Sequence, residues 1–304
     1  MKKVALVTYS KQPKLFDGDN LLVDPFKKHG FSVKVTPWDK KNILWEDFDL
    51  IILRSCWDYH LRTKEFLNWL EYLESRKAKL WNPVSIIRWN MNKKYLIDLE
   101  KEGFPIIPTV LVEKESIKDI QKIASDNKWE EIIVKPTIGN SAYNTHKLRL
   151  NDLESELPQL TKMLQNNELI IQPFMEKINQ EGEYSFIFFN KQYSHTVLKK
   201  PKENEFRSQR EFGGKELKME SNHQLISQAK RILNKINSPI LYARIDGLDI
   251  DGQLKFMELE LIEPYLFFEK DEAAAEKFVE AAVYLSNTSY FGSSIIPINN
   301  ISEV

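Results

Sequence analysis

Three carboxylates, Asp246, Glu258 and Glu260, stand close together in the segment 242–264. Apolar, strand-forming residues surround each of them, so these acids are expected to be at least partly buried. Burying several carboxylates costs free energy unless cations compensate them, and a hard divalent metal is suitable because it prefers oxygen ligands. The segment therefore predicts a metal site on a β-hairpin. The alternative is an edge hairpin whose acids face water.

Strand geometry limits which charges of this segment can meet. Side chains alternate between the two faces of a strand, so Arg244 shares a face with Asp246. Glu258 and Glu260 share a face for the same reason. Pairing Asp246 with Glu258 across the hairpin would place Arg244 opposite the second acid of that strand. All four charges would then converge.

The length of the connecting loop sets this pairing. A two-residue loop, 251–252, would place Met257 opposite Asp246 and send the acids to opposite faces. A three-residue loop, 251–253, would place Glu258 opposite Asp246 instead. Because three-residue hairpin loops commonly contain a Gly at a position of positive φ, as this segment does, we predict the three-residue loop.

Two lysines stand where a phosphate could be bound. Lys93 lies at an expected helix start, and Lys135 ends an apolar strand, where a buried ammonium needs an anionic partner. The following loop, 137–145, is small and polar, and such loops expose backbone amides that can hold phosphate oxygens. A solvated lysine on a helix face and an ordinary surface loop are the alternatives.

A strand that stops at a proline could recognise a base. The expected strand 169–172 is followed by Pro173, which leaves backbone groups free to hydrogen-bond an adenine edge, with Phe174 and Met175 as apolar contacts. Glu183 opens the next expected strand and could accept a ribose hydroxyl. The alternatives are a strand that feeds a turn and an exposed acid at a strand end.

The polar tract 199–214 holds further candidates, among them Arg207 and the pair Gly213 and Gly214. Arginine forks match carboxylates and phosphates, although a solvated loop is the alternative. No P-loop, CxxC pair or HExxH motif occurs in the sequence. The histidines show no ligand spacing, and His195, on an expected strand, is predicted to pack or to face substrate rather than to bind a metal.

Alternating strands and helices predict a small parallel α/β sheet at the start of the chain, where ligands gather at the carboxyl ends of strands. Its expected strands are 4–9, 31–36, 49–54 and 79–81, and its helices are 20–29 and 64–75. Beyond residue 89 the expected strands are 109–112, 131–135, 169–172, 183–189 and 192–197, followed by the acidic hairpin. The expected helices there are 93–102, 116–127, 153–165, 225–234 and 273–285.

The amino-acid composition limits the classes of protein to which this chain can belong. The chain has 304 residues, of which 42% are hydrophobic and 29% charged, as is usual for a globular protein of two or three lobes. Its net charge of −1 gives no electrostatic case for binding nucleic acid or a membrane surface. No apolar run approaches the roughly 18 residues of a membrane-spanning helix. The single cysteine, Cys56, is expected to be a small buried residue in a cytoplasmic protein.

The order of these signals resembles the ATP-grasp superfamily from about residue 89 to residue 268. The branch with the glutathione-synthetase-like proteins and D-cycloserine synthetase is the most similar, on the runs Arg-Ser-Cys-Trp-Asp-Tyr at 54–59, Gln-Pro-Phe at 172–174, Gly-Glu-Tyr-Ser at 182–185, Phe-Gly-Gly at 212–214 and Tyr-Ala-Arg-Ile-Asp at 242–246. The resemblance implies two α+β lobes that sandwich ATP, preceded by a small parallel α/β domain. The expected boundaries are 1–88, 89–172 and 173–304.

The resemblance also implies a role for each candidate residue. ATP would be bound by Lys93, Lys135, Asn140, Ser141, Gln172, Pro173, Phe174, Met175 and, at the ribose, Glu183. Mg²⁺ ions would be held by Asp246, Glu258 and Glu260, and Arg244 would stabilise the transferring phosphate. The substrate would lie near Arg54, Lys199, Arg207, Gly213 and Gly214. Two departures stand out: Glu260 replaces a frequent Asn, which would tighten metal binding or favour Mn²⁺, and the phosphate loop is poor in Gly.

The expected activity is that of an ATP-dependent carboxylate–amine ligase that forms an amide-type bond through an acyl phosphate. The loops 137–145 and 202–214 are the candidate lids that would keep water from this intermediate. A small-molecule kinase and a non-catalytic nucleotide-binding protein are the alternatives, and retention of the three acids and Arg244 weakens the second. The expected partners are a small carboxylate and an amine, without nucleic acid or membrane, and a homodimer is the default assembly.

Overall fold

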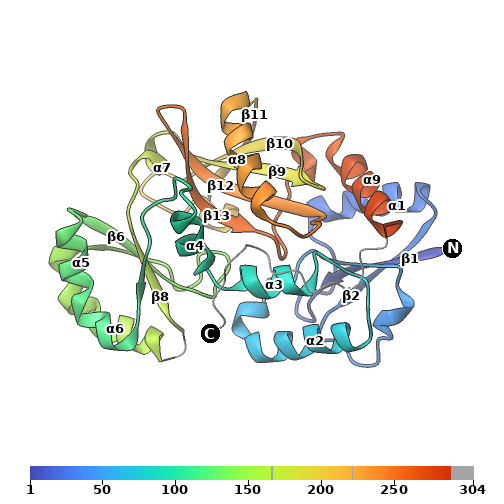
Figure 1. Cartoon of the computed structure of the whole chain (residues 1–304), viewed down its shortest axis with the longest axis horizontal. Helices are drawn as coiled ribbons and strands as arrows, with labels where there is room; N and C mark the ends of the chain where they lie inside the picture. Colours follow the sequence, from blue (N-terminus) through green and yellow to red (C-terminus); the bar gives the residue numbers. More distant parts are fainter. Residues whose placement is uncertain (166, 221, 289–304) are drawn as a thin grey trace.

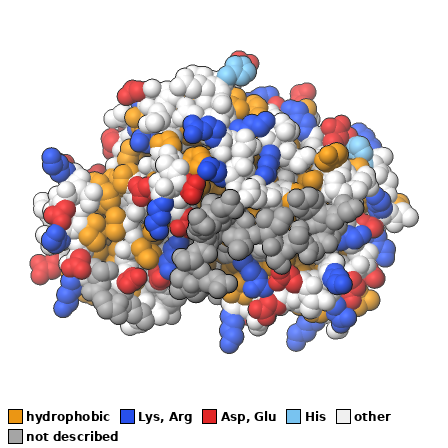
Figure 2. Space-filling view, in the orientation of Figure 1, with side chains coloured by type: hydrophobic (Ala, Val, Ile, Leu, Met, Phe, Trp, Pro, Cys, Tyr) orange, Lys and Arg blue, Asp and Glu red, His pale blue; other side chains and the backbone are white. Residues whose placement is uncertain are grey.

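Three β-sheets organise the part of the chain that the computed structural model describes, which is residues 1–165, 167–220 and 222–288. Figure 1 shows the lobe of β6 and β8 on the left, the sheet of β9 to β13 above, and the first sheet on the right. Residues 289–304, which the expected third lobe includes, lie outside the described residues. Positive and negative side chains are interspersed over the face seen in Figure 2. In the described ranges, no helix is both long enough and apolar enough to cross a membrane.

The first sheet is parallel, as predicted, with the strand order β2-β1-β3-β4. Its elements are β1 (Lys2–Thr8), α1 (Val23–Lys28), β2 (Phe31–Pro37), β3 (Leu50–Leu53), α2 (Thr63–Ser75) and β4 (Leu80–Trp81). Alternate residues of β1 enter two different cores. Val7 packs in a core with Phe66 of α2, whereas Leu6 packs in one with Phe278 of α9 (Ala274–Ser286). The last described helix therefore covers one face of the first sheet.

The second sheet is antiparallel, with the order β5-β8-β6-β7. Its lobe contains β5 (Val110–Val112), α5 (Ile120–Asp126), β6 (Glu131–Pro136), β7 (His146–Arg149), α6 (Leu153–Leu164) and β8 (Leu169–Pro173), of which β7 was not predicted. The preceding helix, α4 (Tyr95–Lys101), packs in the core of the third sheet instead. Ile132 and Val134 of β6 are fully buried in a core with α5 and α6. Because the strand alternates, Ile133 and Lys135 point to the opposite face, where a cavity lies.

The third sheet is antiparallel and has the order β11-β10-β9-β12-β13. Its elements are α7 (Lys177–Gln180), β9 (Glu183–Phe189), β10 (Gln192–Lys200), β11 (Lys215–Met219), α8 (His223–Lys235), β12 (Tyr242–Ile250) and β13 (Gln253–Glu260). The strand β11 was not predicted, because its charged run of alternating exposure carries almost no apolar signal. Leu225 and Leu233 of α8 pack in a core with Phe186 and Ile245 of the sheet.

The turn between β12 and β13 has two residues, so the prediction of a three-residue loop is wrong. Ile250 pairs with Gln253, and the turn residues between them are Asp251 and Gly252. Both turn residues have positive φ, at 53° and 80°. Two consecutive residues of positive φ are typical of the tight hairpin turn whose twist matches that of the strands, and Asp-Gly is a favoured sequence for it.

The predicted meeting of the charges is nevertheless confirmed, because a β-bulge corrects the register. From the turn the pairing runs to Gly247 with Phe256, and it resumes at Asp246 with Glu258. Met257 is the extra residue on β13, so two residues there oppose one on β12. The bulge therefore returns the acids of both strands to one face.

The strand β13 lies at the edge of its sheet, and side chains from the segment before the second sheet form hydrogen bonds with backbone groups along its outer side. The Asn90 amide of α3 (Val84–Met91) donates to the carbonyl of Leu259 at 2.7 Å and accepts from the amide of Leu261 at 2.8 Å. The Tyr95 hydroxyl donates to the Leu259 carbonyl at 3.1 Å and accepts from the Leu259 amide at 3.0 Å. An otherwise unpaired strand edge is thereby held in place directly beside the acids.

Replacing Asn90 with alanine is expected to lower the free energy of unfolding by about 1–3 kcal/mol, because it leaves the buried amide of Leu261 unsatisfied and removes one of the two side-chain hydrogen bonds to the Leu259 carbonyl. Urea unfolding followed by circular dichroism measures this change. The matched control is Asn68→Ala on the exposed face of α2, which should stay within about 0.5 kcal/mol of the parent. Equal losses for the two variants would show that the Asn90 contacts do not stabilise the edge.

Candidate active site

Two cavities meet in the cleft that the three sheets surround. The first has a volume of about 150 Å³ and lies between the second and third sheets; the second has about 380 Å³ and lies between the third sheet and the first lobe. Seven polar residues at the junction line both cavities: Asn140, Ser141, Glu183, Gln209, Glu258, Glu260 and Glu263. The two cavities therefore share one wall of polar side chains.

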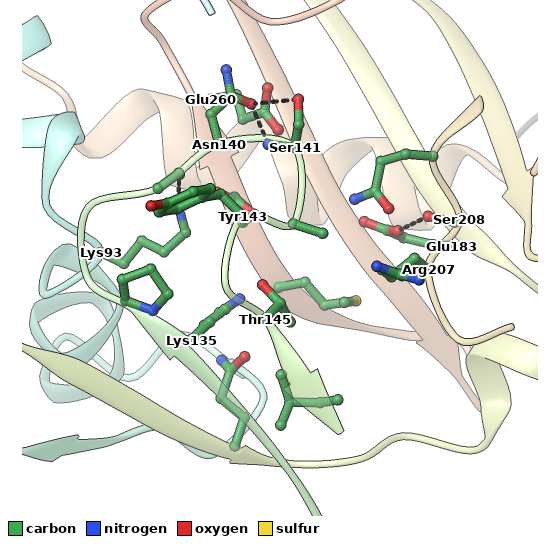
Figure 3. A pocket seen from close by; sticks show the side chains of 18 of the residues that line it. Lys93, Lys135, Asn140, Ser141, Tyr143, Thr145, Glu183, Arg207, Ser208 and Glu260 are labelled. Carbon is green, nitrogen blue, oxygen red and sulfur yellow. Dashed lines mark hydrogen bonds and ion pairs between the residues drawn. The ribbon is translucent and has the colours of Figure 1, made fainter. Parts of the chain in front are cut away.

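Both candidate phosphate lysines lie in the first cavity (Figure 3). The ammonium of Lys93 contacts Glu258 Oε1 at 2.8 Å and donates to the carbonyl of Gly139 at 2.8 Å. Burial lowers the pKa of Lys135, and the charge of Glu258 opposes this shift. The buried Lys93 thus pairs directly with an acid of β13, and the half-buried Lys135 lies within the influence of the same acid.

The expected adenine-binding strand end borders the same cavity, since Gln172, Pro173, Phe174 and Met175 all line it. The Gln172 amide donates to Thr109 Oγ1 at 2.8 Å, which fixes its side chain against β5. The backbone here is less free than predicted, because Pro173 still pairs with Ile132 of β6 and the Phe174 amide donates to the carbonyl of Glu131 at 2.9 Å. The apolar side chains of this wall remain suited to hold a flat base.

Glu183 lies beyond that wall, where it accepts a hydrogen bond from Ser208 Oγ at 2.7 Å (Figure 3). The ammonium of Lys199 contacts Glu183 at 3.1 Å and Asp246 at 2.9 Å. Although burial opposes it, these two acids raise the pKa of Lys199. Lys199 therefore remains a buried cation at the second cavity.

Asp246 is the most strongly compensated acid of the site. Its oxygens accept from Ser185 Oγ at 2.6 Å, Lys199 Nζ at 2.9 Å and Arg244 Nε and Nη2 at 3.0 Å. Burial opposes ionisation, but Arg244 and Lys199 outweigh it and hold the pKa of Asp246 well below its usual range. A metal ion can bind Asp246 only if one of these donors moves away.

The two acids of β13 differ in their charge environment. Burial opposes ionisation of Glu258, but Lys93 and Lys135 lower its pKa. Burial raises the pKa of Glu260 to about 7, because Arg244 only partly offsets burial and the nearby acids. Arg244 Nη2 contacts Glu260, and Arg244 Nη1 donates to the carbonyl of Tyr265 at 3.0 Å. The buried guanidinium thus links both strands of the hairpin.

The donor set fits a hard divalent metal that is bound together with a nucleotide. No group of three or more His, Cys, Asp and Glu within the described ranges is arranged to hold a metal alone. Mg²⁺ is usually bound by one or two carboxylates together with substrate phosphates, so a complete protein cage is not required. The Glu258 and Glu260 oxygens, both at the junction of the cavities, meet that requirement.

The loop 137–145 lies against both the third sheet and the first lobe. The Asn140 amide donates to Glu263 Oε1 at 2.6 Å, and the Tyr143 ring lies 4.9 Å from the ring of His60. Ser141 and Ala142 adopt positive φ, at 49° and 55°, without being glycine. Residues other than glycine thus adopt the left-handed backbone conformation in this loop. The contacts of Asn140 and Tyr143 on either side of them hold this strained backbone in place.

Glu263 was not among the predicted site residues, although it lies only three positions after Glu260. Strand alternation would place residue 263 on the opposite face, but β13 ends at Glu260 and the chain then turns toward the cavities. Burial and the charge of Glu260 raise the pKa of Glu263 well above its usual range. No periodic signal in the sequence could have identified it.

The position of Arg54 differs from the prediction that it lies beside the substrate. It is only 1% exposed and lines neither cavity, and its Nε donates to Asp19 Oδ1 at 2.9 Å. Its Nη2 donates to the carbonyl of Pro264 at 2.8 Å. Arg54 does lie at a strand end, as predicted. Its side chain turns inward, however, and connects the first lobe to the backbone at the end of the acidic segment. Arg207 also departs from the predicted group, because it lines the first cavity and is paired with Glu205, whereas Lys199 lines the second.

Gly213 and Gly214 line neither cavity and instead shape the turn before β11. Gly213 has φ of 82°, and a Cβ at Gly214 would lie 2.1 Å from the carbonyl oxygen of Ser208. Only glycine fits there, so the expected substrate contact of this pair is wrong. The turn instead positions the neighbouring Gln209 and Arg210, which do line the second cavity.

Cys56 and His195 are packing residues. Cys56 is fully buried and its thiol contacts the carbonyl of Val7 at 3.3 Å. His195 contacts Ser194 and, at 3.1 Å, the carbonyl of Leu266, and it lines neither cavity. Cys56 is buried, as predicted, and of the two alternatives for His195 the structure shows packing.

Burial lowers the pKa of His195 from 6.5 to about 4. The unfolded chain binds this proton at a higher pH than the folded protein, so stability falls as pH drops from about 6.5 toward 4. We expect His195 to account for about 2 kcal/mol of the stability lost between pH 7 and pH 5. Urea unfolding at both pH values checks this, and the loss should be smaller by that amount in His195→Gln. An unchanged loss would contradict it.

Two family models match most of the chain. The model of the N-terminal domain of D-cycloserine synthetase DcsG matches residues 4–82, and that of the ATP-grasp domain of prokaryotic glutathione synthetase matches residues 98–272. The second match alone covers more than half of the chain. Both agree with the resemblance seen in the sequence.

Individual relatives agree with these models. The cycloserine biosynthesis protein DcsG of Streptomyces lavendulae is 27% identical over 277 residues, which cover 86% of this chain and 91% of that protein. The crystal structure of D-cycloserine synthetase DcsG superposes with a TM-score of 0.83 at 24% identity, covering 94% of this chain and all of that one. D-alanine–D-alanine ligase from Bacillus anthracis gives a TM-score of 0.65 at 17% identity, covering 94% and 97%. The chain therefore belongs to the ATP-grasp superfamily, with the ATP-grasp domain of the prokaryotic glutathione synthetases, and is an ADP-forming carboxylate–amine ligase.

Proposed function

We propose that this ligase binds ATP in the first cavity and joins a small, amino-acid-like carboxylate to an amine in the second. The observation that carries this proposal is the junction of the two cavities, where the acids of β13 line both. A phosphoryl group can be transferred only where the end of the nucleotide and the substrate carboxylate meet. Glu258 and Glu260 lie at that point, with Lys93 and Lys135 on the side of the first cavity and Arg244 and Asp246 on the side of the second.

The proposed roles on the nucleotide side follow from the cavity walls. Lys93 and Lys135, with Asn140 and Ser141 of the loop, would hold the phosphates. Gln172 to Met175 would border the adenine and Glu183 the ribose. Asp246, Glu258 and Glu260 would hold Mg²⁺ or Mn²⁺, which when bound offsets the charge of the phosphate oxygens.

The proposed phosphoryl transfer depends on positive charge that the side chains of the protein supply. Arg244, released from the acids as nucleotide binds, would face the phosphoryl group and stabilise the charge that develops on it. The substrate carboxylate attacks this group and becomes an acyl phosphate, with Lys199 as the nearby cation of the second cavity. The loop 137–145 would exclude water, which would otherwise hydrolyse the acyl phosphate.

Trapping with hydroxylamine tests this proposal without knowledge of the natural amine. The protein is incubated with ATP, Mg²⁺, hydroxylamine and each member of a panel of L- and D-amino acids, and hydroxamate and ADP are measured. At least one acid should give both products in equal amounts. Calorimetry shows separately whether ATP binds. If ATP binds but no acid gives hydroxamate, the proposed substrate class is contradicted.

The organisation of the chain belongs to the same proposal. The proposed lobes are 1–88, 89–172 and 173–304, and each contains one of the three sheets. A cytoplasmic location is supported by the buried, unpaired cysteine, which suits a reducing compartment. The homodimer stays a prediction, and gel filtration with light scattering tests it.

A further inference from the structure

Glu263 is a buried carboxylate at the junction of the cavities, 6% exposed, and no cation pairs with it in the described part of the chain. The other acids of the second cavity that are not exposed each have a cation: Lys199 for Glu183 and Asp246, Lys93 for Glu258, Arg244 for Glu260 and Arg210 for Glu216. A buried carboxylate without such compensation is costly. Glu263 is therefore the acid of this cavity whose charge a cationic ligand would balance.

Three contacts from separate elements fix the position of Glu263. The Asn140 amide of the phosphate loop donates to its Oε1 at 2.6 Å. Trp57 Nε1 donates to its backbone carbonyl at 3.3 Å, and Arg54 Nη2 donates to the carbonyl of the next residue, Pro264, at 2.8 Å. These contacts hold the carboxylate at the cavity wall from both the first lobe and the loop. A side chain fixed in this way is suited to orient a ligand.

Aromatic side chains form the neighbouring wall of the second cavity. The ring of Phe16 lies 5.2 Å from that of Trp57 and 5.2 Å from that of Tyr265. The ring of Tyr265 in turn lies 4.8 Å from that of Phe267. A carboxylate beside a cluster of aromatic rings is an environment that favours an ammonium group, because both attract a cation.

We infer that Glu263 binds the acceptor amine as its ammonium ion, against the wall formed by Phe16, Trp57 and Tyr265. This inference rests on the proposed function, because it assigns the second cavity to the substrates. It adds the group that selects a cationic amine and holds it beside the acyl phosphate.

Glu263 also provides a destination for the proton that the ammonium must lose. The carboxylate takes one proton from the ammonium, which leaves a neutral amine and a neutral carboxyl. The amine nitrogen then forms the bond to the acyl carbon, and the bond from that carbon to the phosphate oxygen breaks. The second proton leaves with the phosphate as hydrogen phosphate, and the third stays on the amide. Glu263 later returns its proton to solvent.

The test compares hydroxylamine, which is largely uncharged at neutral pH, with methylammonium chloride, which is a cation. Methylammonium should reduce hydroxamate formation by the parent protein, because it occupies the ammonium site. Glu263→Gln can still accept from Asn140, and its remaining hydroxamate formation is measured in the same way. The concentration of methylammonium needed to halve it should rise by about tenfold or more, since a charged hydrogen bond is lost. Glu263→Asp should keep part of the effect, and the surface variant Glu276→Gln should match the parent.

Each other result would overturn the inference. Equal inhibition of parent and Glu263→Gln, or no inhibition of the parent, would exclude an ammonium site at Glu263. Electron paramagnetic resonance measures Mn²⁺ binding to the ADP complex. If a folded Glu263→Gln formed no hydroxamate and bound Mn²⁺ more weakly in this measurement, Glu263 would be a metal ligand instead. Glu263→Asp with normal thermal unfolding and no response to methylammonium would exclude the site even if the Gln variant fails to fold. Absence of hydroxamate from the parent with every acid would remove the proposed function, and this inference with it.

Discussion

Replacing Arg244 with methionine is expected to lower kcat for hydroxamate and ADP formation by about 10³-fold or more, because a preorganised cation at the transferring phosphate is lost. The same change should destabilise the nucleotide-free protein. Arg244 contacts both Asp246 and Glu260, and removal of one partner from a buried ion pair costs about 3–5 kcal/mol. Turnover at saturating ATP and urea unfolding without ligand measure the two effects separately.

The control for Arg244→Met is Arg88→Met, whose guanidinium contacts Glu74 at 3.0 Å on the surface. Exposed pairs contribute about 0–1 kcal/mol, so both its kcat and its stability should stay close to those of the parent. A fully active Arg244→Met would assign Arg244 to structure alone. An inactive Arg244→Met of parental stability would mean that the nucleotide-free protein does not depend on this ion pair.

The acidic hairpin shows how much of the site could be predicted from the sequence. Alternation along each strand placed Asp246 on a common face with Arg244, and Glu258 with Glu260, and the structure confirms both. The loop length was wrong because a tight Asp-Gly turn and the bulge at Met257 together give the same register as a longer loop. A bulge depends on packing against the rest of the sheet, so local sequence does not specify it.

Contacts between distant segments could not be predicted in this way. The sequence placed Arg54 at a strand end, but its ion pair with Asp19 depends on how the first lobe packs against the last helix. Asn90 binds the edge of β13 about 170 residues further along the chain. Glu263 enters the site because the chain turns after β13. Each of these depends on tertiary structure rather than on periodicity.

Replacing Glu258 with glutamine is expected to lower kcat by about 10²–10³-fold while nucleotide binding is largely kept. The change preserves the shape of the side chain but removes the charge that faces Lys93 and that would hold a divalent metal. Lys93 retains its contact with the carbonyl of Gly139, so one anchor of its ammonium remains. Hydroxamate formation gives kcat, and calorimetry with a non-hydrolysable ATP analogue gives the affinity with and without Mg²⁺.

The result of Glu258→Gln separates catalysis from binding. A metal role requires that the gain in nucleotide affinity on adding Mg²⁺ shrinks in the variant, because one carboxylate ligand is missing. Glu168→Gln, which loses only the half-exposed pair with Lys94, is the matched control and should keep parental turnover and the full gain. Turnover within threefold of the parent would show that Glu258 is not needed for phosphoryl transfer. Lost turnover with an unchanged Mg²⁺ effect would indicate that Glu258 acts mainly by holding Lys93 in place.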